Sequence, residues 1–520
     1  MQQVKRSERI LGGLLIIGLL LRLPLLHWVK YPGWGDYAFY YTVARNLAMG
    51  RGFIIDYIWH FLYLPPQVTH YSNDYWMPMT SIVMAIPMSI LGSSLQVGAF
   101  TSAGVGTLLG CLAYWLAREH GRSSFVALSA AAYTLVFTPL LTYSLLTDTP
   151  VYYAFFAGLA FLFLSRSARH PASYRPLLLA GVLVGFTHLT RQDGVLLIIL
   201  LLFIAGVYGE RARVRRVGVA LLAYGITLLP WLVLNQIYLG HPWTSGTMRT
   251  LFFRSYADMY AYKRVIDWHY YLSWGWGNIL RSKLHAFLFN AHTFYSYLPF
   301  FMWALIVVGG IMGIQQWIHR ERRIPHLYIW PFCHGFLLYV FYTLFFTFPG
   351  IQGGFLRSSM FLLPFLAIFV AETIERYITP PRAARIFVVV TFLFMAYYGV
   401  RAAHRMVLSN ARAGEGIARI IPLLEEEQNR GQEVVLMTIA PWEFHAVTGV
   451  KTVQIPTEDR EAIYELALRY GVTHLVLPGK RDRFDALYRG EETDPRFLFW
   501  RRVPDSPMKL YRLRSSSGER

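Results

Sequence analysis

Long apolar segments separated by short basic loops recur along most of this chain. Each segment is close to the roughly 20 residues that a helix needs to cross the hydrocarbon core of a bilayer. The pattern predicts eleven membrane spans, near residues 10–30, 95–117, 123–144, 149–165, 175–190, 194–209, 217–238, 293–316, 326–347, 353–374 and 385–404. The fifth and sixth are short and could instead form one re-entrant pair. We therefore expect a polytopic α-helical membrane protein.

The pattern changes after residue 404, where short runs typical of strands alternate with helical periodicity. Strands are predicted at 434–437, 452–455, 473–477, 497–503 and 509–513, and helices at 413–428, 442–447 and 460–470. This alternation is typical of a small α/β domain with a partly parallel sheet. We divide the chain into a membrane domain, 1–404, and a C-terminal domain, 405–520. The C-terminal domain lacks a Gly-rich phosphate loop, so we do not expect a nucleotide site.

Composition agrees with the membrane class, since only 15% of residues are charged against about 25% in soluble proteins. The formal net charge of +19 comes mostly from short loops, and basic loops mark the cytoplasmic side. We therefore expect no nucleic-acid partner. One alternate set of loops is basic throughout: Lys5/Arg6/Arg9, Arg118/Arg122, Arg166/Arg169/Arg175, Arg211/Arg213/Arg215/Arg216, Arg320/Arg322/Arg323 and Arg376/Arg382/Arg385. We therefore expect a protein of the plasma (inner) membrane whose N-terminus is cytoplasmic and whose C-terminal domain is external.

The first outward loop begins with a helical pattern. From Asp36 onward apolar residues recur at helical spacing, and Gly50 and Gly52 follow where such a helix would end. A short amphipathic helix along the membrane interface is predicted. Asp36 stands where an N-cap residue belongs. The sequence leaves two roles open for Asp36, as a helix cap and as a catalytic carboxylate.

Three further charged features fall at outward ends of spans: Asp148, Arg191 with Asp193, and Arg357. Each has a structural alternative, because Asp148 can cap the helix opening at Thr149-Pro150 and Arg191 can pair with Asp193. All of these residues are predicted to lie on the same side of the membrane. This placement favours an enzyme that transfers a sugar from a polyprenyl phosphate at the outer face. A carboxylate can then act as general base on an acceptor hydroxyl, while arginines hold the phosphate leaving group.

The outward loop 239–292 mixes basic and aromatic residues, including His241. This mixture suits a sugar or an anionic lipid, although a loop lying on the membrane would have the same composition. The sequence identifies no cofactor with certainty. A divalent metal is an open alternative: His241, His269, Asp36 and Asp148 carry suitable atoms but show no metal-ligand spacing.

Over roughly residues 10–375 the chain resembles the GT-C superfamily of integral membrane glycosyltransferases. It is most similar to the branch of the family 39 protein mannosyltransferases and the bacterial aminoarabinose transferase. The motifs are Gly35-Asp36 followed by YTVARNLAMGRG at 41–52, Thr147-Asp148-Thr149-Pro150, LTRQDG at 189–194, and Arg357 before Leu362-Leu363-Pro364.

The resemblance implies that Asp36 is the catalytic carboxylate and that Asp148 is a second acid of the site. The candidates for substrate binding are Arg191, Asp193, Arg357 and His241, with Tyr40 and Arg45 of the first motif. The expected partners are a polyprenyl-phosphate-linked sugar donor and a lipid, glycan or protein acceptor. Relatives often have paired acids where Tyr37 follows Asp36 here, so the identity of the donor stays open.

Two other classes remain alternatives at this point. A transporter or lipid flippase would favour charges or broken helices near mid-membrane and internal repeats. A structural or sensory protein would act through its external domain. A transferase instead predicts that Asp36 and Asp148 converge on one outward cavity that is connected laterally to lipid.

Overall fold

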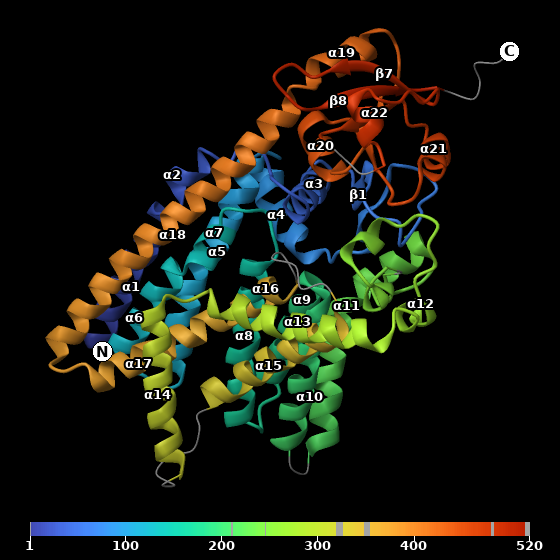
Figure 1. Ribbon diagram of the computed structural model, residues 1–520. Coiled ribbons are helices and arrows are strands. Elements are labelled where there is room, and N and C mark those ends of the chain that lie inside the picture. The colour runs from blue at the N-terminus through green and yellow to red at the C-terminus, as the bar shows by residue number, and fades with distance from the viewer. Residues whose placement is uncertain are drawn as a thin grey trace.

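The computed structural model describes residues 2–209, 212–244, 246–318, 326–347, 354–479 and 483–514. A large assembly of helices carries a small α/β unit at one end (Figure 1). The described part of the chain ends just after β8 in the α/β unit, and α1 begins toward the opposite end of the helices (Figure 1). Arg211, Arg320, Arg322, Arg323 and the predicted outward loop 348–352 lie outside the described residues.

The N-terminal half of the chain is mostly helical. Its helices are α1 (Gln2–Leu20), α2 (Leu23–Leu26), α3 (Asp36–Ala48), α4 (Met79–Leu91), α5 (Leu95–Glu119), α6 (Ser124–Val136), α7 (Thr138–Tyr143), α8 (Pro150–Arg169), α9 (Arg175–Thr190), α10 (Leu197–Val207) and α11 (Arg213–Leu239). The loop after α3 contains strands β1 (Ile54–Ile55), β2 (Tyr57–Ile58) and β3 (His70–Tyr71), and the 3₁₀ helix η1 (Ser72–Asp74). A further 3₁₀ helix, η2 (Gln192–Leu196), joins α9 to α10.

The second half begins with the loop after α11 and ends in the α/β unit. The loop holds η4 (Met248–Phe252), η5 (Tyr256–Tyr260) and α12 (Trp268–Leu272). The helices that follow are α13 (Trp276–Tyr295), α14 (Phe300–Ile318), α15 (His326–Phe345), α16 (Gly354–Ser359), η6 (Met360–Leu362), α17 (Leu363–Tyr377) and α18 (Pro381–Ala418). The α/β unit comprises α19 (Ile421–Asn429), β4 (Val435–Thr438), α20 (Pro441–Thr448), β5 (Lys451–Gln454), α21 (Arg460–Arg469), β6 (His474–Leu477), α22 (Asp485–Arg489), β7 (Phe497–Arg502) and β8 (Lys509–Leu513).

Among the described residues, seven helical segments are long and apolar enough to cross a membrane. They are Arg6–Leu26, Leu95–Glu119, Pro150–Arg169, Arg213–Leu239, Leu327–Phe345, Gly354–Tyr377 and Pro381–Asn429. The helices Trp276–Tyr295 and Phe300–Gln315, bent by 100° against each other, pass the same test only as a pair and would make an eighth span if they cross the membrane together. The predicted spans near 123–144, 175–190 and 194–209 are also helical, but their helices have only 10–17 residues. The protein is therefore a multi-pass membrane protein, as predicted.

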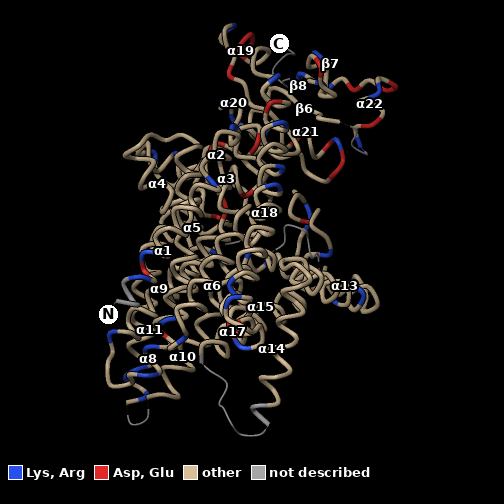
Figure 2. Tube along the Cα trace, turned by 90° about the vertical axis from the view of Figure 1, so that its left-hand side faces the viewer, with Lys and Arg blue, Asp and Glu red and all other residues tan. Residues whose placement is uncertain are grey.

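The basic loops meet at one end of the helices. Glu119 after α5 binds Arg166 and Arg169 at the end of α8, at 2.6 and 2.7 Å. Arg216 at the start of α11 donates to Ser167 Oγ at 2.7 Å, and Arg122 pairs with Glu372. Figure 2 shows Lys and Arg gathered at this end of the helices, far from the α/β unit. Loops that hydropathy assigned to one side thus lie together.

Arg22, which interrupts the first apolar segment, is fully buried inside the protein. Its guanidinium donates to Ser144 Oγ at 2.8 Å, to the Gly18 carbonyl at 2.7 Å and to the Leu135 carbonyl at 3.0 Å. Because buried charged groups are costly unless they are hydrogen-bonded, these three acceptors explain how the charge is tolerated. The residue holds α1 against α6 and the segment after α7.

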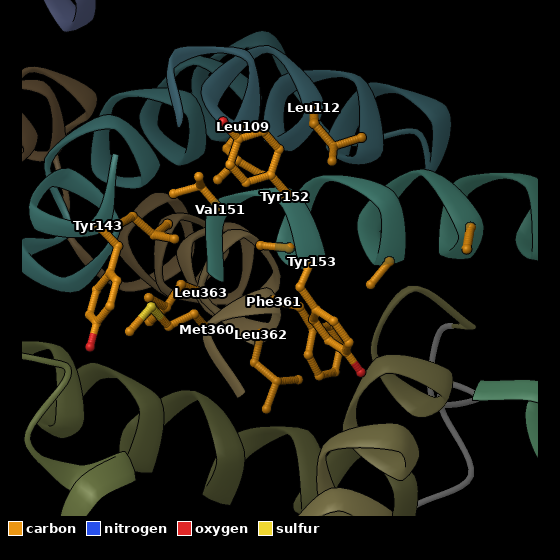
Figure 3. Packing of buried hydrophobic residues seen from close by; sticks show 14 of the residues in the cluster. Leu109, Leu112, Tyr143, Val151, Tyr152, Tyr153, Met360, Phe361, Leu362 and Leu363 are labelled. Carbon is orange, nitrogen blue, oxygen red and sulfur yellow. The ribbon is translucent and has the colours of Figure 1, made fainter. Parts of the chain in front are cut away.

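One part of the hydrophobic core is built by α8 packed on η6 and the start of α17 (Figure 3). Phe161 stacks on Phe361 with ring centroids 5.7 Å apart, and Tyr153 meets the same ring edge-on at 6.3 Å. Val151 and Leu363 are fully buried nearby. This packing fixes the segment that precedes α8 against the segment that precedes η6.

The α/β unit contains a six-stranded sheet in the order β2-β5-β4-β6-β8-β7. Strands β2, β5, β4 and β6 are parallel, and β8 and β7 are antiparallel, so the predicted partly parallel sheet is confirmed. Its edge strand β2 comes from the loop after α3, with Tyr57 opposite Thr452. Residue 404 lies inside α18, and the predicted helix 413–428 is wrong in detail because the chain breaks between α18 and α19.

The α/β unit packs directly on α3. Helix α20 contacts α3 and places Trp442 against Trp59 of the first loop at 5.6 Å. Trp59 in turn stacks on Trp76 at 4.0 Å, with the ring planes only 9° apart, and Trp76 reaches Phe39 of α3 at 4.4 Å. Aromatic rings therefore connect the C-terminal unit to the helix that begins with Asp36.

Candidate active site

Arg357 of α16 joins the two predicted carboxylates. The Nη2 atom of its guanidinium lies 3.0 Å from Asp36 Oδ2, and its Nε lies 2.8 Å from Asp148 Oδ2. The Arg357 side chain is 7% exposed, Asp148 is 0% and Asp36 is 20%. Three charged residues from three distant parts of the chain thus meet at one buried site, and solvent reaches Asp36 more than the other two.

Asp36 is the first residue of α3 rather than its cap. The N-cap is Gly35, whose φ of 57° lies in the left-handed region that glycine tolerates best. The capping alternative for Asp36 is therefore wrong. Burial raises the pKa of the Asp36 carboxyl, the Arg357 charge lowers it, and the Asp148 charge raises it again, with a net upward shift.

The surroundings of Asp36 also differ from the prediction. Helix α3 does not lie exposed along an interface, because most of its residues, including Phe39, Val43 and Ala44, are buried. Its C-terminal end is as predicted, with Gly50 and Gly52 both at positive φ. Asp36 is consequently held by a helix that is packed on several sides.

Asp148 directly precedes the cap of α8. The N-cap residue is Thr149, and Pro150 opens the helix. One Asp148 oxygen accepts the Thr149 N–H at 2.6 Å, while the other binds Arg357. The expected capping role is therefore wrong, and the carboxylate is oriented by its neighbour's backbone toward Arg357.

Arg191 and Asp193 form a second cluster beside the first. They pair at 3.2 Å, so the structural alternative for them is confirmed. Arg191 also donates to Ser358 Oγ at 2.9 Å and to Thr149 Oγ1 at 3.2 Å. Since Ser358 follows Arg357 and Thr149 follows Asp148, the two clusters adjoin. Tyr342 of α15 donates to Asp193 and accepts from Arg191 at 3.3 Å.

The remaining predicted residues lie at different distances from this centre. Tyr40 is buried one turn after Asp36; burial raises the pKa of its hydroxyl and the Asp36 charge raises it further. Arg45 is nine residues along the same helix, about 13 Å away at 1.5 Å per residue. His241 bonds the Trp243 carbonyl of its own loop. These positions and contacts do not test whether Tyr40, Arg45 or His241 binds a substrate, so that role stays a prediction.

Sequence reasoning missed Ser358 and Tyr342, which carry no motif, and also a buried cluster in the first loop. Asp74 lies 3.2 Å from His60 Nε2 and 3.7 Å from His70 Nε2. Burial opposes the ionisation of Asp74, yet the two imidazoles hold its pKa well below the usual range. The four-residue spacing of His70 and Asp74 is the only feature of the sequence that could have indicated this cluster.

The described residues contain no group of three or more His, Cys, Asp and Glu side chains arranged to hold a metal ion. Asp36 and Asp148, which carried the metal alternative, are joined instead by the Arg357 cation. The two carboxylates therefore converge, as the transferase hypothesis predicted. The predicted cavity connected to lipid, and the roles of the two residues, stay predictions.

Comparisons with known proteins address the class and the fold of the chain. A model of glycosyltransferase family 87 matches residues 75–329, a range that includes Asp148, Arg191 and Asp193. A search of curated protein sequences finds no significant match.

Among solved structures, the chain is similar to ArnT from Cupriavidus metallidurans in the apo state, with 12% identity and a TM-score of 0.58 over 96% of this chain and 98% of that one. The same enzyme bound to undecaprenyl phosphate gives 12% identity and a TM-score of 0.57 over 99% and 98%. The Archaeoglobus fulgidus oligosaccharyltransferase in complex with Zn and sulfate gives 13% identity and a TM-score of 0.50 over 90% and 67%.

The fold and the family match define the class: the chain is a polytopic membrane glycosyltransferase of the GT-C superfamily. The predicted superfamily is therefore confirmed, although the family model that matches is 87 and not 39. The transporter and sensory alternatives are set aside.

Proposed function

We propose that this glycosyltransferase moves a sugar from a polyprenyl-phosphate donor to an acceptor hydroxyl at the outer face of the plasma membrane. The observation that carries the proposal is the bridge by Arg357 between Asp36 and Asp148. A cation between two carboxylates is suited to a reaction that both removes a proton and develops negative charge on phosphate. The complex of ArnT with undecaprenyl phosphate supports the class of donor.

Asp36 acts as the general base. It is the more accessible of the two carboxylates, and its raised pKa brings it closer to that of a hydroxyl-activating base at neutral pH. The acceptor oxygen attacks the anomeric carbon as its proton passes to Asp36. Asp148 orients Arg357, to which it is bound from the buried side.

Arg357 stabilises the leaving group. The bond from the anomeric carbon to the phosphate oxygen breaks, and the polyprenyl phosphate gains a negative charge that guanidinium N–H groups can share. Donor phosphate replaces Asp36 as a partner of Arg357, which releases the base as the donor binds. Arg191 is a weaker candidate for a phosphate ligand, because Asp193 already pairs with it.

One displacement with a single base inverts the anomeric configuration. We expect purified protein in lipid vesicles to consume radiolabelled undecaprenyl-phosphate-linked hexoses or pentoses, to release undecaprenyl phosphate and to leave nucleotide sugars untouched. The acceptor is sought among envelope lipids, glycans and proteins, and NMR of the product reports the configuration. Retention of configuration, or transfer from a nucleotide sugar, would contradict the proposal.

The orientation of the protein is part of the proposal. The end of the helices that collects Lys and Arg faces the cytoplasm, and the α/β unit is external. We expect reporter fusions after Arg216 and after Arg520 to give cytoplasmic and external signals respectively. The same compartment for both positions would place the candidate site on the wrong side of the membrane.

A further inference from the structure

The segment that leads into Asp36, residues 31–35, packs against the C-terminal part of the chain. Figure 1 shows α18 as a single long helix that runs from the membrane helices to the α/β unit. The space between this segment, the end of α18 and α20 is a cavity of about 10 Å³, room for about one water molecule. Among its lining residues are Tyr31, Gly33, Asn410, Gly414 and Glu443. The segment and the two helices are therefore in close contact.

Two glycines permit this close approach. A Cβ atom on Gly414 of α18 would lie 2.5 Å from Tyr31 Cβ, and a Cβ atom on Gly33 would lie 2.5 Å from Asn410 Cγ. Real Cβ atoms essentially never come within 3.0 Å of another heavy atom. Gly416, two residues further along α18, has no heavy atom within 4 Å of its Cβ position. A methyl group at position 414 would therefore displace the segment, whereas one at position 416 would not.

Trp442 of α20 holds the other end of the segment. Its Nε1 lies 3.9 Å from the position that a Cβ atom on Gly35 would occupy, and its side chain is 2% exposed. Helix α20 is in turn anchored to the sheet, because Thr452 Oγ1 donates to the Pro441 carbonyl at 2.7 Å. Since Gly35 is the N-cap of α3 and Asp36 is its first residue, the Trp442 ring lies against the start of the helix that carries the carboxylate.

We propose that these two contacts, Gly414 with Tyr31 and Trp442 with Gly35, act as a clamp that positions Asp36 for proton transfer. Gly414 and Trp442 are then positioning residues, and the C-terminal unit is a working part of the active site. The inference rests on the proposed function, because it takes Asp36 as the general base.

The mechanism gives the clamp its purpose. Asp36 is paired with Arg357 at 3.0 Å, and in the proposed reaction the donor phosphate replaces Asp36 as the partner of Arg357. From then on, the position of the carboxylate depends more on the backbone that carries it. A displacement of about 1 Å can cost about a hundredfold in rate, so a clamp on residues 31–35 acts directly on catalysis.

The first experiment compares Gly414→Ala with Gly416→Ala in vesicles, using undecaprenyl-phosphate-linked sugar. Both substitutions favour the helical state of α18, and only the first creates a clash. We expect Gly414→Ala to lower kcat by about tenfold to a hundredfold and to leave the donor KM unchanged, because Arg357 lies on α16 outside the clamped segment. Gly416→Ala should behave like the parent. Equal kcat values for the two variants would overturn the proposal.

Tyr31→Gly tests whether the loss passes through the predicted contact. This substitution removes the side chain that a methyl group at position 414 would meet. We expect Gly414→Ala to lower kcat in the parent and to have almost no further effect in the Tyr31→Gly protein, as for two changes at one contact. The same loss in both backgrounds would overturn the role of this contact.

The second experiment replaces the aromatic contact of the clamp. We expect Trp442→Ala to lower kcat without changing the donor KM, and Trp442→Phe to restore most of the rate because it keeps an aromatic ring. Trp500→Ala is the control, since Trp500 packs on His474 in the same unit at 4.9 Å. Thermal unfolding in detergent checks that each variant is folded. Parental kcat in a folded Trp442→Ala protein, or an equal loss in Trp500→Ala, would overturn the proposal. If Trp442→Ala does not fold, the comparison at position 414 decides.

Asp36→Asn separates this inference from the proposed function. If it is inactive while the clamp variants behave like the parent, only the inference fails. If it transfers sugar normally, the proposed function itself fails. Because the clamp acts through Asp36, Gly414→Ala should cause little further loss of the residual rate in the Asp36→Asn protein. A full additional loss there would show that Gly414 acts on the reaction by another route and would overturn the clamp.

Discussion

Asp36→Asn is expected to leave a folded, membrane-inserted protein whose sugar transfer falls by about a hundred- to ten-thousandfold, the usual contribution of a general base. Asparagine keeps the shape of the side chain and can still accept a hydrogen bond from Arg357. Because Gly35 is the N-cap of α3, the substitution removes no helix cap. Arg357 also keeps Asp148 as a partner, so the loss should appear in kcat and not in stability.

Asp56→Asn provides the matched control for Asp36→Asn. Asp56 is a carboxylate of the loop that follows α3, and it is also paired with an arginine, with Arg51 at 2.9 Å. We expect this variant to transfer sugar at nearly the parent rate. Measurements are initial rates of transfer from undecaprenyl-phosphate-linked sugar, together with thermal unfolding of both variants in detergent. Near-normal transfer by Asp36→Asn would refute the role of Asp36 as base.

The membrane-spanning part of the fold could be predicted because its signal is local. An apolar run such as 95–117 reports its own helix, and the structure has α5 there. The bent pair α13 and α14 was predicted only in its second half, since Trp276–Tyr295 alternates apolar and polar positions and has no continuous apolar run. Length and hydropathy cannot recognise such a helix.

Contacts between segments that are far apart in the chain could not be predicted from the sequence. Strand β2 has only two residues, Tyr57 and Ile58, and its partner β5 begins at Lys451, so no local pattern assigns the first loop to the C-terminal sheet. The contact between α20 and α3 was likewise unpredicted, because the helical pattern at 442–447 does not show that Trp442 faces the first loop. These contacts bring the C-terminal unit to the helix that carries Asp36.

The site was predicted as a set of residues but not as an arrangement. Hydropathy placed Asp36, Asp148, Arg191 and Arg357 on one side of the membrane. It could not decide which arginine meets which carboxylate, because Arg357 and Asp148 are 209 residues apart. The capping error at Asp36 has a local cause: Gly35 takes the cap position at positive φ, which shifts the helix start by one residue. The roles of these residues stay predictions.

Arg357→Lys is expected to weaken donor binding and to slow transfer, on the order of a hundredfold for one lost charge-stabilising donor. Lysine keeps the positive charge but loses the planar guanidinium, whose separate N–H groups reach Asp36 and Asp148 at once. Since Arg357 lowers the pKa of Asp36 and lysine preserves the charge, the acid limb of the rate against pH should move little. Activity still rises with pH as Asp36 loses its proton.

The glutamine variant separates charge from geometry. Arg357→Gln removes the cation, so the pKa of Asp36 rises further and the acid limb should move to higher pH, because only the ionised carboxylate accepts a proton. It also leaves two carboxylates without their shared cation, which typically costs about 3–5 kcal/mol for a buried pair, so the lysine variant is the primary test. Arg249→Lys is the control: Arg249 donates to the Leu62 carbonyl in the outward loop, and its replacement should leave donor KM unchanged. Parental donor KM and kcat in Arg357→Lys would reduce Arg357 to a packing residue and remove the leaving-group step from the mechanism.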